Sequence, residues 1–195
     1  YYNIHTHKIK TDSLNEEKSV LNVYPEDFES AKKISGAFYF SCGVHPWYSD
    51  DAEDRINILK DILNNEEVVA VGEVGLDKLR GPSINIQMQV LESQIELAEQ
   101  VQKPLIIHCV KAWDELILLY KKHKGSIPWI LHGYRGNSEQ TKQFAKLGFK
   151  FSIGEKFNED SLRYIPHNSI FCETDESDIS ICNVYENIYT HLKLS

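Results

Sequence analysis

The stretch from Val68 to Asp77, VVAVGEVGLD, constrains the fold of this chain more than any other. It opens as an apolar, β-branched run, which is typical of a strand buried on both faces of a parallel sheet. We expect this strand to end at Glu73, where a carboxylate flanked by glycines interrupts the run. In barrels and doubly wound sheets, chemistry takes place at the carboxyl ends of the strands. Glu73 is therefore a candidate functional acid.

Similar strand-like runs recur along the chain and alternate with helical patterns, which predicts a parallel sheet. Right-handed crossovers place the carboxyl ends of such strands on one rim. We predict an α/β fold of the (β/α)8 TIM-barrel type, minimal or distorted because 195 residues is a short chain for it. It would form a single domain over residues 1–195. The expected strands are 3–7, 19–23, 37–42, 68–73, 105–108, 129–133, 149–154 and 170–175, and the expected helices are 24–35, 50–64, 86–102, 113–122, 138–147, 158–164 and 183–194.

Composition excludes some classes of protein. A net charge of -8 argues against a broad basic face for nucleic acid, although bound metals can supply positive charge for a phosphate substrate. No apolar run approaches ~20 residues, so we expect no membrane-spanning helix. The four cysteines lack CxxC spacing, and Tyr1-Tyr2-Asn3 lacks the basic and apolar regions expected of a signal peptide. We expect reduced thiols and a cytoplasmic protein.

Ligand-type side chains gather where the predicted strands end. Five of the eight histidines lie there, together with two carboxylates. A lone histidine at such a place is more often a hydrogen-bonded core residue, and a lone aspartate can cap a helix. Their coincidence at one rim favours a metal site, because so many polar groups crowded together need compensation. The set is His5, His7, His45, Glu73, His108, His132 and Asp175.

Four imidazoles and two carboxylates suit two divalent metals better than one closed structural zinc. Mg, Mn and Zn all accept such a mixed set, so the pattern leaves the metal open. Glu73 lies between the two groups of histidines in the sequence and is the best candidate for a bridging carboxylate. Asp175 could bind a metal and accept the proton of an attacking water.

Several motifs, in this order, resemble the TatD family of metal-dependent hydrolases and deoxyribonucleases. They are His5-Thr6-His7, Gly43-Val44-His45-Pro46, Gly72-Glu73-Val74-Gly75-Leu76-Asp77, Ile107-His108, His132-Gly133-Tyr134-Arg135-Gly136 and Glu173-Thr174-Asp175. The resemblance covers almost the whole chain. It implies a (β/α)8 barrel, a two-metal centre and 3′-to-5′ trimming of single-stranded DNA or RNA ends.

Carried over to this chain, the resemblance makes His5, His7, Glu73, His108, His132 and Asp175 the metal ligands. His45 would lie near the scissile group, and Glu73, Asp175 and His45 would be catalytic. The chain departs from the family pattern at Asn3, where an Asp is usual, at Val110, where an Arg is usual, and at Glu176, which replaces a proline. It is also shorter than is usual in the family.

Substrate contacts are expected from His45, Lys111 and Arg135. Lys78 and Arg80 could also hold phosphates, although ordinary surface charge explains them equally well. Trp47, Tyr134 and Trp113 could stack bases, with packing the simpler role for Trp113. We expect neither a membrane nor an obligate protein partner.

Two other functions stay open. The same site could hydrolyse an ester or amide, such as D-aminoacyl-tRNA, which the acidic net charge favours. Alternatively, the chain could be a catalytically reduced barrel used for binding.

Overall fold

The computed structural model describes residues 1–8, 17–35, 39–123 and 125–193. Within this part of the chain, eight strands follow one another in the sheet in the order β1 to β8, and the pairings of β1–β2, β3–β4, β4–β5, β6–β7 and β7–β8 are parallel. The strands are β1 Tyr2–Thr6, β2 Lys18–Val23, β3 Tyr39–Cys42, β4 Val68–Asp77, β5 Leu105–Val110, β6 Trp129–Leu131, β7 Lys150–Ile153 and β8 Ile170–Cys172. The predicted (β/α)8 order is confirmed.

Seven α-helices lie in the described residues: α1 Phe28–Ser35, α2 Ala52–Ile62, α3 Ile84–Val101, α4 Trp113–His123, α5 Ser138–Leu147, α6 Glu159–Leu162 and α7 Ile181–Lys193. Short 3-10 helices span Pro25–Asp27, Pro46–Asp51 and His167–Ser169. Residues 37 and 38 of the strand expected over 37–42, and residue 194 of the last expected helix, lie outside the described residues. None of the helices in the described ranges is long and apolar enough to cross a membrane.

The chain forms two compact units. Unit 1 comprises residues 1–21 and 130–195, and unit 2 comprises residues 22–129. The division falls within β2 and β6, so each of these strands contributes to both units. The single domain expected over residues 1–195 stays a prediction.

In unit 1, β1 pairs with β2, and its last residue, Thr6, forms an isolated parallel bridge with Asp175, just beyond β8. The core of unit 1 includes an aromatic pair, since Phe144 of α5 packs edge-on against Phe149 and both are buried. Helix α5 begins at Asn137, whose side chain accepts a hydrogen bond from Gln140, and ends at the left-handed Gly148. Capping hydrogen bonds therefore fix both ends of α5, the helix that connects β6 to β7.

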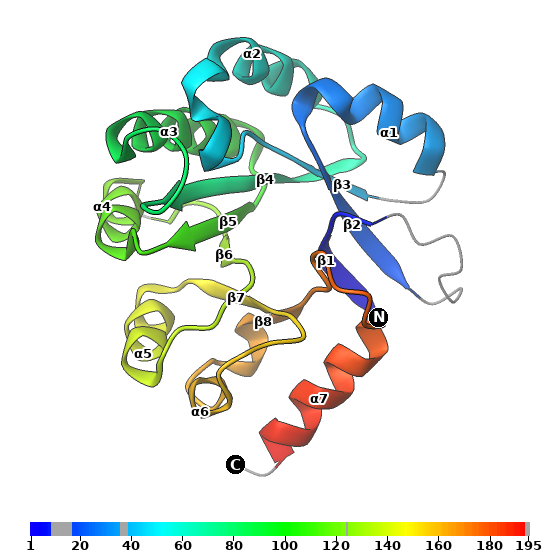
Figure 1. Ribbon diagram of the computed structural model, residues 1–195, viewed down its shortest axis with the longest axis vertical. Coiled ribbons are helices and arrows are strands. Elements are labelled where there is room, and N and C mark those ends of the chain that lie inside the picture. Colours follow the sequence, from blue (N-terminus) through cyan, green and yellow to red (C-terminus); the bar gives the residue numbers. More distant parts are fainter. Residues whose placement is uncertain (9–16, 36–38, 124, 194–195) are drawn as a thin grey trace. The chain divides into compact units, whose positions relative to one another are not determined.

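In unit 2, β4 is the longest strand, and all of its residues except Val69 are buried. Helix α3 lies along β4 and α4 along β5 (Figure 1). Leu91 and Ile95 of α3 are fully buried, as are Val71 and Val74 of β4. Burying each such side chain contributes about 1.5–3 kcal/mol. The buried Cys42 at the end of β3 is a free thiol, and burial raises its pKa to about 12.

The sequence prediction of where β4 and β5 end was wrong. β4 continues past Glu73 to Asp77, and β5 continues past His108 to Val110, so both side chains project from within a strand. Glycine is the physical reason, because it lets β4 approach its neighbour without ending it. A Cβ atom on Gly75 would lie 1.9 Å from the His108 carbonyl oxygen, and Gly75 has a φ of 148°.

We therefore expect Gly75→Ala to lower the free energy of unfolding by at least about 3 kcal/mol, because the new methyl would force β4 away from β5. Urea denaturation measures the loss. Gly154→Ala is the matched control, since its Cβ would meet its nearest neighbour at an ordinary 3.7 Å. A Gly75→Ala variant as stable as this control would contradict the packing described for β4 and β5.

Candidate functional site

In unit 1, His5, His7 and Asp175 converge. Nε2 of His5 and Nε2 of His7 each lie 3.6 Å from the same carboxylate oxygen, Oδ1 of Asp175. The two imidazole rings are 5.0 Å apart and nearly perpendicular. His5 is fully buried, whereas the side chain of His7 is one-third exposed. His5 of β1 and His7, which follows that strand, therefore face the same carboxylate.

Main-chain hydrogen bonds hold Asp175 against β1. Its N–H donates to the carbonyl of His5 at 3.0 Å, and its carbonyl accepts from the N–H of His7 at 3.3 Å. The Thr6 hydroxyl donates to the same carbonyl at 3.2 Å. Asp175 has a φ of 52°, a left-handed conformation that non-glycine residues adopt rarely and that clusters at functional sites. Strand β1 thus fixes where this carboxylate points.

Asn3 reinforces the same junction. Its amide nitrogen donates to the Thr174 hydroxyl at 2.9 Å, and its amide oxygen accepts from the Thr174 N–H at 3.1 Å. An amide can donate and accept at once, which an ionised carboxylate cannot do. Asn3 therefore serves this buried contact well, although it replaces the Asp that is usual in the family it resembles.

His132 follows β6 and lies against a buried carboxylate. Nδ1 of His132 is 3.2 Å from Oε1 of Glu173, and the same oxygen accepts a hydrogen bond from the Gly133 N–H at 2.6 Å. This contact engages Nδ1 and leaves Nε2 as the other ring nitrogen, and the centres of the His5 and His132 rings are 4.4 Å apart. A carboxylate that holds one ring nitrogen while the other is left for a metal is a recurrent arrangement.

In unit 2, His45, Glu73 and His108 form a second cluster. Oε1 of Glu73 lies 2.9 Å from Nδ1 of His108 and 3.3 Å from Nε2 of His45. Glu73 is only 6% exposed, so a charge here needs close partners. On α3, Gln94 accepts from the Val44 N–H at 2.7 Å and donates to the Val44 carbonyl at 3.1 Å, which fixes the residue before His45.

Asp77 orients His108 from the other side. Its Oδ2 lies 3.3 Å from Nε2 of His108 and accepts a hydrogen bond from the Trp47 indole at 2.7 Å. Burial raises the pKa of Asp77, but hydrogen bonds from Trp47, Leu79 and His108 outweigh it and leave the pKa below its ordinary value. An ionised Asp77 therefore holds Nε2–H of His108 and turns Nδ1 toward Glu73.

Both clusters fit a divalent metal. Each residue of the two triads offers a nitrogen or carboxylate oxygen within 4.8 Å of the other two. Donors at ~2.1 Å from a tetrahedral metal are roughly 3.4 Å apart, given ordinary Zn–N and Zn–O distances. The 3.6 Å spacings around Asp175 are close to this value. That all six predicted ligands meet around one pair of ions, with Glu73 as a bridge, stays a prediction.

The other residues expected to contact substrate differ in their surroundings. Tyr134 is only 3% exposed and its hydroxyl pairs with Thr141, so the idea that it stacks bases was wrong. The ring packs against Phe151 in the core, which the polar, glycine-flanked motif did not indicate. Lys111 follows β5 and is exposed.

Lys78 and Arg80, two cations that could hold phosphates, are already engaged. Lys78 forms an ion pair with Glu115 at 2.7 Å. This contact favours the interpretation of Lys78 as ordinary surface charge. Arg80 lies 3.6 Å from the centre of a Trp47 ring and covers it. A base could stack on Trp47 only after Arg80 moves aside.

The roles of Asp77 and Glu173 as partners of histidines were not predicted from the sequence. Both belong to the motifs already noted, but nothing in the sequence distinguishes a carboxylate that orients a histidine from one that binds a metal. Burial distinguishes them here, because Asp77 is 4% exposed and Glu173 is fully buried, and each lies against a ring nitrogen.

The sequence profile described as TatD related DNase matches residues 8–181. The chain belongs to this family. Among curated relatives, "Uncharacterized metal-dependent hydrolase YjjV" of Escherichia coli K12 is 29% identical over 154 residues, covering 73% of this chain and 60% of its own length. The "3'-5' ssDNA/RNA exonuclease TatD" of Edwardsiella piscicida is 31% identical, covering 69% of this chain and 56% of its own length. The chain thus spans little more than half the length of several family members.

Solved structures of the family share the fold. The crystal structure of the E. coli TatD homologue YjjV superposes with a TM-score of 0.73 at 24% identity, covering 91% of this chain and 83% of that one. A TatD family hydrolase from Entamoeba histolytica superposes with a TM-score of 0.71 at 16% identity, covering 89% and 73%. At these identities the likeness supports the TIM-barrel fold class alone.

We expect Asp77→Asn to weaken Mn²⁺ binding about 10- to 100-fold, because losing a carboxylate that orients a ligating histidine has effects of that size. Isothermal titration calorimetry measures the affinity. Asp61→Asn, an exposed change on α2, serves as the control and should leave it unchanged. Equal affinities in the two variants would mean that His108 does not bind a metal.

Proposed function

We propose that the chain is a metal-dependent hydrolase that cuts phosphodiester bonds at the ends of single-stranded DNA or RNA. Family membership and the names of its relatives support the hydrolase class. The observation that carries the proposal is the convergence of His5 and His7 on one oxygen of Asp175, at 3.6 Å each. The cytoplasmic location expected from the free cysteines belongs to the same proposal.

The proposed ligands of two divalent ions, Mg, Mn or Zn, come from both clusters. They are His5, His7, Glu73, His108, His132 and Asp175. Bound divalent ions would lower the pKa of a water and offset the negative charge that develops on phosphoryl oxygens. Glu173 and Asp77 keep His132 and His108 oriented, which preserves the geometry of the ligands between turnovers.

The protein's own residues handle the proton. Asp175 is held by the main chain of β1, and we assign to its Oδ2 the acceptance of the proton from the attacking water. Its Oδ1 faces both histidines of the cluster. The carboxylate can therefore serve as ligand and base through different oxygens.

His45 is better suited to donate a hydrogen bond than to bind a metal. Its Nδ1 accepts a hydrogen bond from the Trp47 N–H at 3.2 Å. A neutral imidazole that accepts at Nδ1 carries its proton at Nε2. That N–H points toward Glu73 and could donate to a phosphoryl oxygen, which supports the role near the scissile group expected from the sequence.

Ester or amide hydrolysis remains a second candidate. The ion pair of Lys78, the burial of Tyr134 and the net charge of -8 remove some expected contacts to nucleic acid and favour a less anionic substrate. A side-by-side screen of oligonucleotides and aminoacyl esters separates the two. Faster release from the esters would support this alternative.

We expect purified protein with Mn²⁺ or Mg²⁺ to release nucleotides from a labelled single strand, and His7→Ala and Glu73→Gln each to lower the rate at least about 100-fold. Denaturing gel electrophoresis follows the release. His167→Ala, an exposed histidine outside both clusters, should retain the wild-type rate. Absence of release by the wild type across several metals would contradict the proposed function.

A further inference from the structure

Unit 1 contains a pocket of about 220 Å³ beside Asp175. The segments that follow β6, β7 and β8 form it, so it lies at the carboxyl ends of three consecutive strands. Its volume is smaller than the ~300–1,000 Å³ typical of pockets for drug-sized ligands. A phosphate with part of a sugar fits such a space better than a whole nucleotide.

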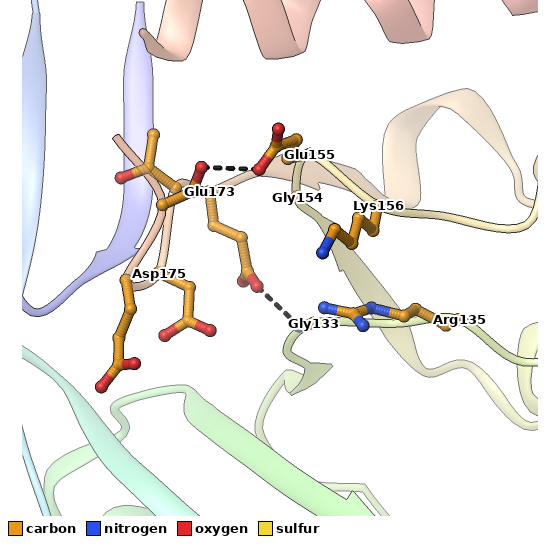
Figure 2. A pocket seen from close by; sticks show the side chains of 10 residues that line it. Gly133, Arg135, Gly154, Glu155, Lys156, Glu173 and Asp175 are labelled. Carbon is orange, nitrogen blue, oxygen red and sulfur yellow. Dashed lines mark hydrogen bonds between the residues drawn. The ribbon is translucent and has the colours of Figure 1, made fainter. Parts of the chain in front are cut away.

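Two cations line one side of the pocket. Figure 2 shows the charged ends of Arg135 and Lys156 pointing into it from the side opposite Asp175. Within the described residues, neither side chain makes a hydrogen bond or ion pair. Elsewhere in unit 1, Lys142 and Arg163 are each paired with a carboxylate of their own segment. Arg135 and Lys156 are therefore available for a ligand.

Glycines leave the space between these groups open. Gly133 and Gly154 line the pocket, and a Cβ atom added to either would meet only Glu173, at an ordinary 3.7 Å. A side chain at position 154 would meet its neighbours at ordinary distances but would occupy the pocket, and at position 133 the φ of 54° also favours glycine. Glu173 is fully buried, and its Oε1 is engaged by the Gly133 N–H and by His132.

The charges in the pocket select the ligand. Carboxylates outnumber cations, since Glu155, Glu173, Asp175 and Glu176 all line it, and Glu155 accepts a hydrogen bond from the Ser177 hydroxyl. An anionic ligand therefore has to contact Arg135 and Lys156 directly and also reach the divalent ion proposed at Asp175, whose charge offsets the excess of carboxylates. A phosphate group does both, because its oxygens match the guanidinium fork and also bind divalent metals.

We propose that Arg135 and Lys156 hold a phosphate group of the substrate in this pocket, next to the group that is hydrolysed. The inference rests on the proposed function and adds Lys156 and a defined binding site to it. The phosphate could belong to a nucleic acid end or to a small phosphate ester, and the chemistry of recognition is the same.

The test measures binding by fluorescence anisotropy with a labelled, phosphorothioate-linked single strand in Mn²⁺. Arg135→Ala and Lys156→Ala should each raise Kd about tenfold, and the double variant about 100-fold, which corresponds to about 1.4 kcal/mol for each cation. The plot of log Kd against log salt should become shallower by about 0.7 for each phosphate that the variant protein no longer neutralises. Calorimetric titration with glucose 6-phosphate provides the small-ester arm.

The matched control is the double variant Lys146→Ala and Arg163→Ala, which removes the same charges from exposed positions of unit 1 outside the pocket. It should bind like the wild type. If the pocket variants bind the single strand or the sugar phosphate more weakly than the control does, the phosphate site is supported. The ligand whose binding weakens then shows whether the phosphate belongs to a nucleic acid end or to a small ester. If the pocket variants bind both ligands like the control, the inference is overturned.

Failure of the two proposals can be told apart. A wild type that binds the strand through Arg135 and Lys156 without cutting it would remove the proposed function and leave the phosphate site. Conversely, cutting that proceeds with unchanged Kd in the pocket variants would retain the function and remove the site.

Discussion

The main-chain pairing of Asp175 with strand β1 is the contact on which the candidate site in unit 1 depends. Two hydrogen bonds join Asp175 to His5 and His7, although these residues lie at opposite ends of the sequence. They impose a left-handed φ on an aspartate and bring its carboxylate to two imidazoles at once. The same pairing lets Asn3 hold Thr174, so the first and last strands form one support.

Buried carboxylates stabilise the histidines in both units in the same way. Glu173 holds His132, and Asp77 holds His108, each through one ring nitrogen. A buried carboxylate or imidazole without a hydrogen-bond partner would destabilise the fold. The hydrogen bond also holds the histidine ring in one orientation, so little side-chain freedom is lost when a metal binds. The arrangement explains why these motifs contain more acids than metal coordination requires.

Much of this organisation could be predicted from the sequence. Alternation of apolar runs with amphipathic segments predicted the (β/α)8 order, which the structure has. The sequence also singled out the residues that form the clusters His5–His7–Asp175 and His45–Glu73–His108, but it did not predict which of them lie together. The ends of the strands could not be predicted as well. Gly72 and Gly75 suggested that the strand ends at Glu73, but in the structure these glycines allow β4 to pack closely on β5 and to continue to Asp77. The burial of Tyr134 and the tasks of Asp77 and Glu173 depend on contacts between distant segments, which no local pattern encodes.

The central claim is that these clusters bind divalent ions. Anomalous diffraction at the manganese edge, from crystals grown with Mn²⁺, tests it most directly. We expect one peak among His5, His7 and Asp175 and a second beside Glu73 and His108. Fully occupied Mn²⁺ elsewhere in the crystal with no peak at either cluster would contradict it.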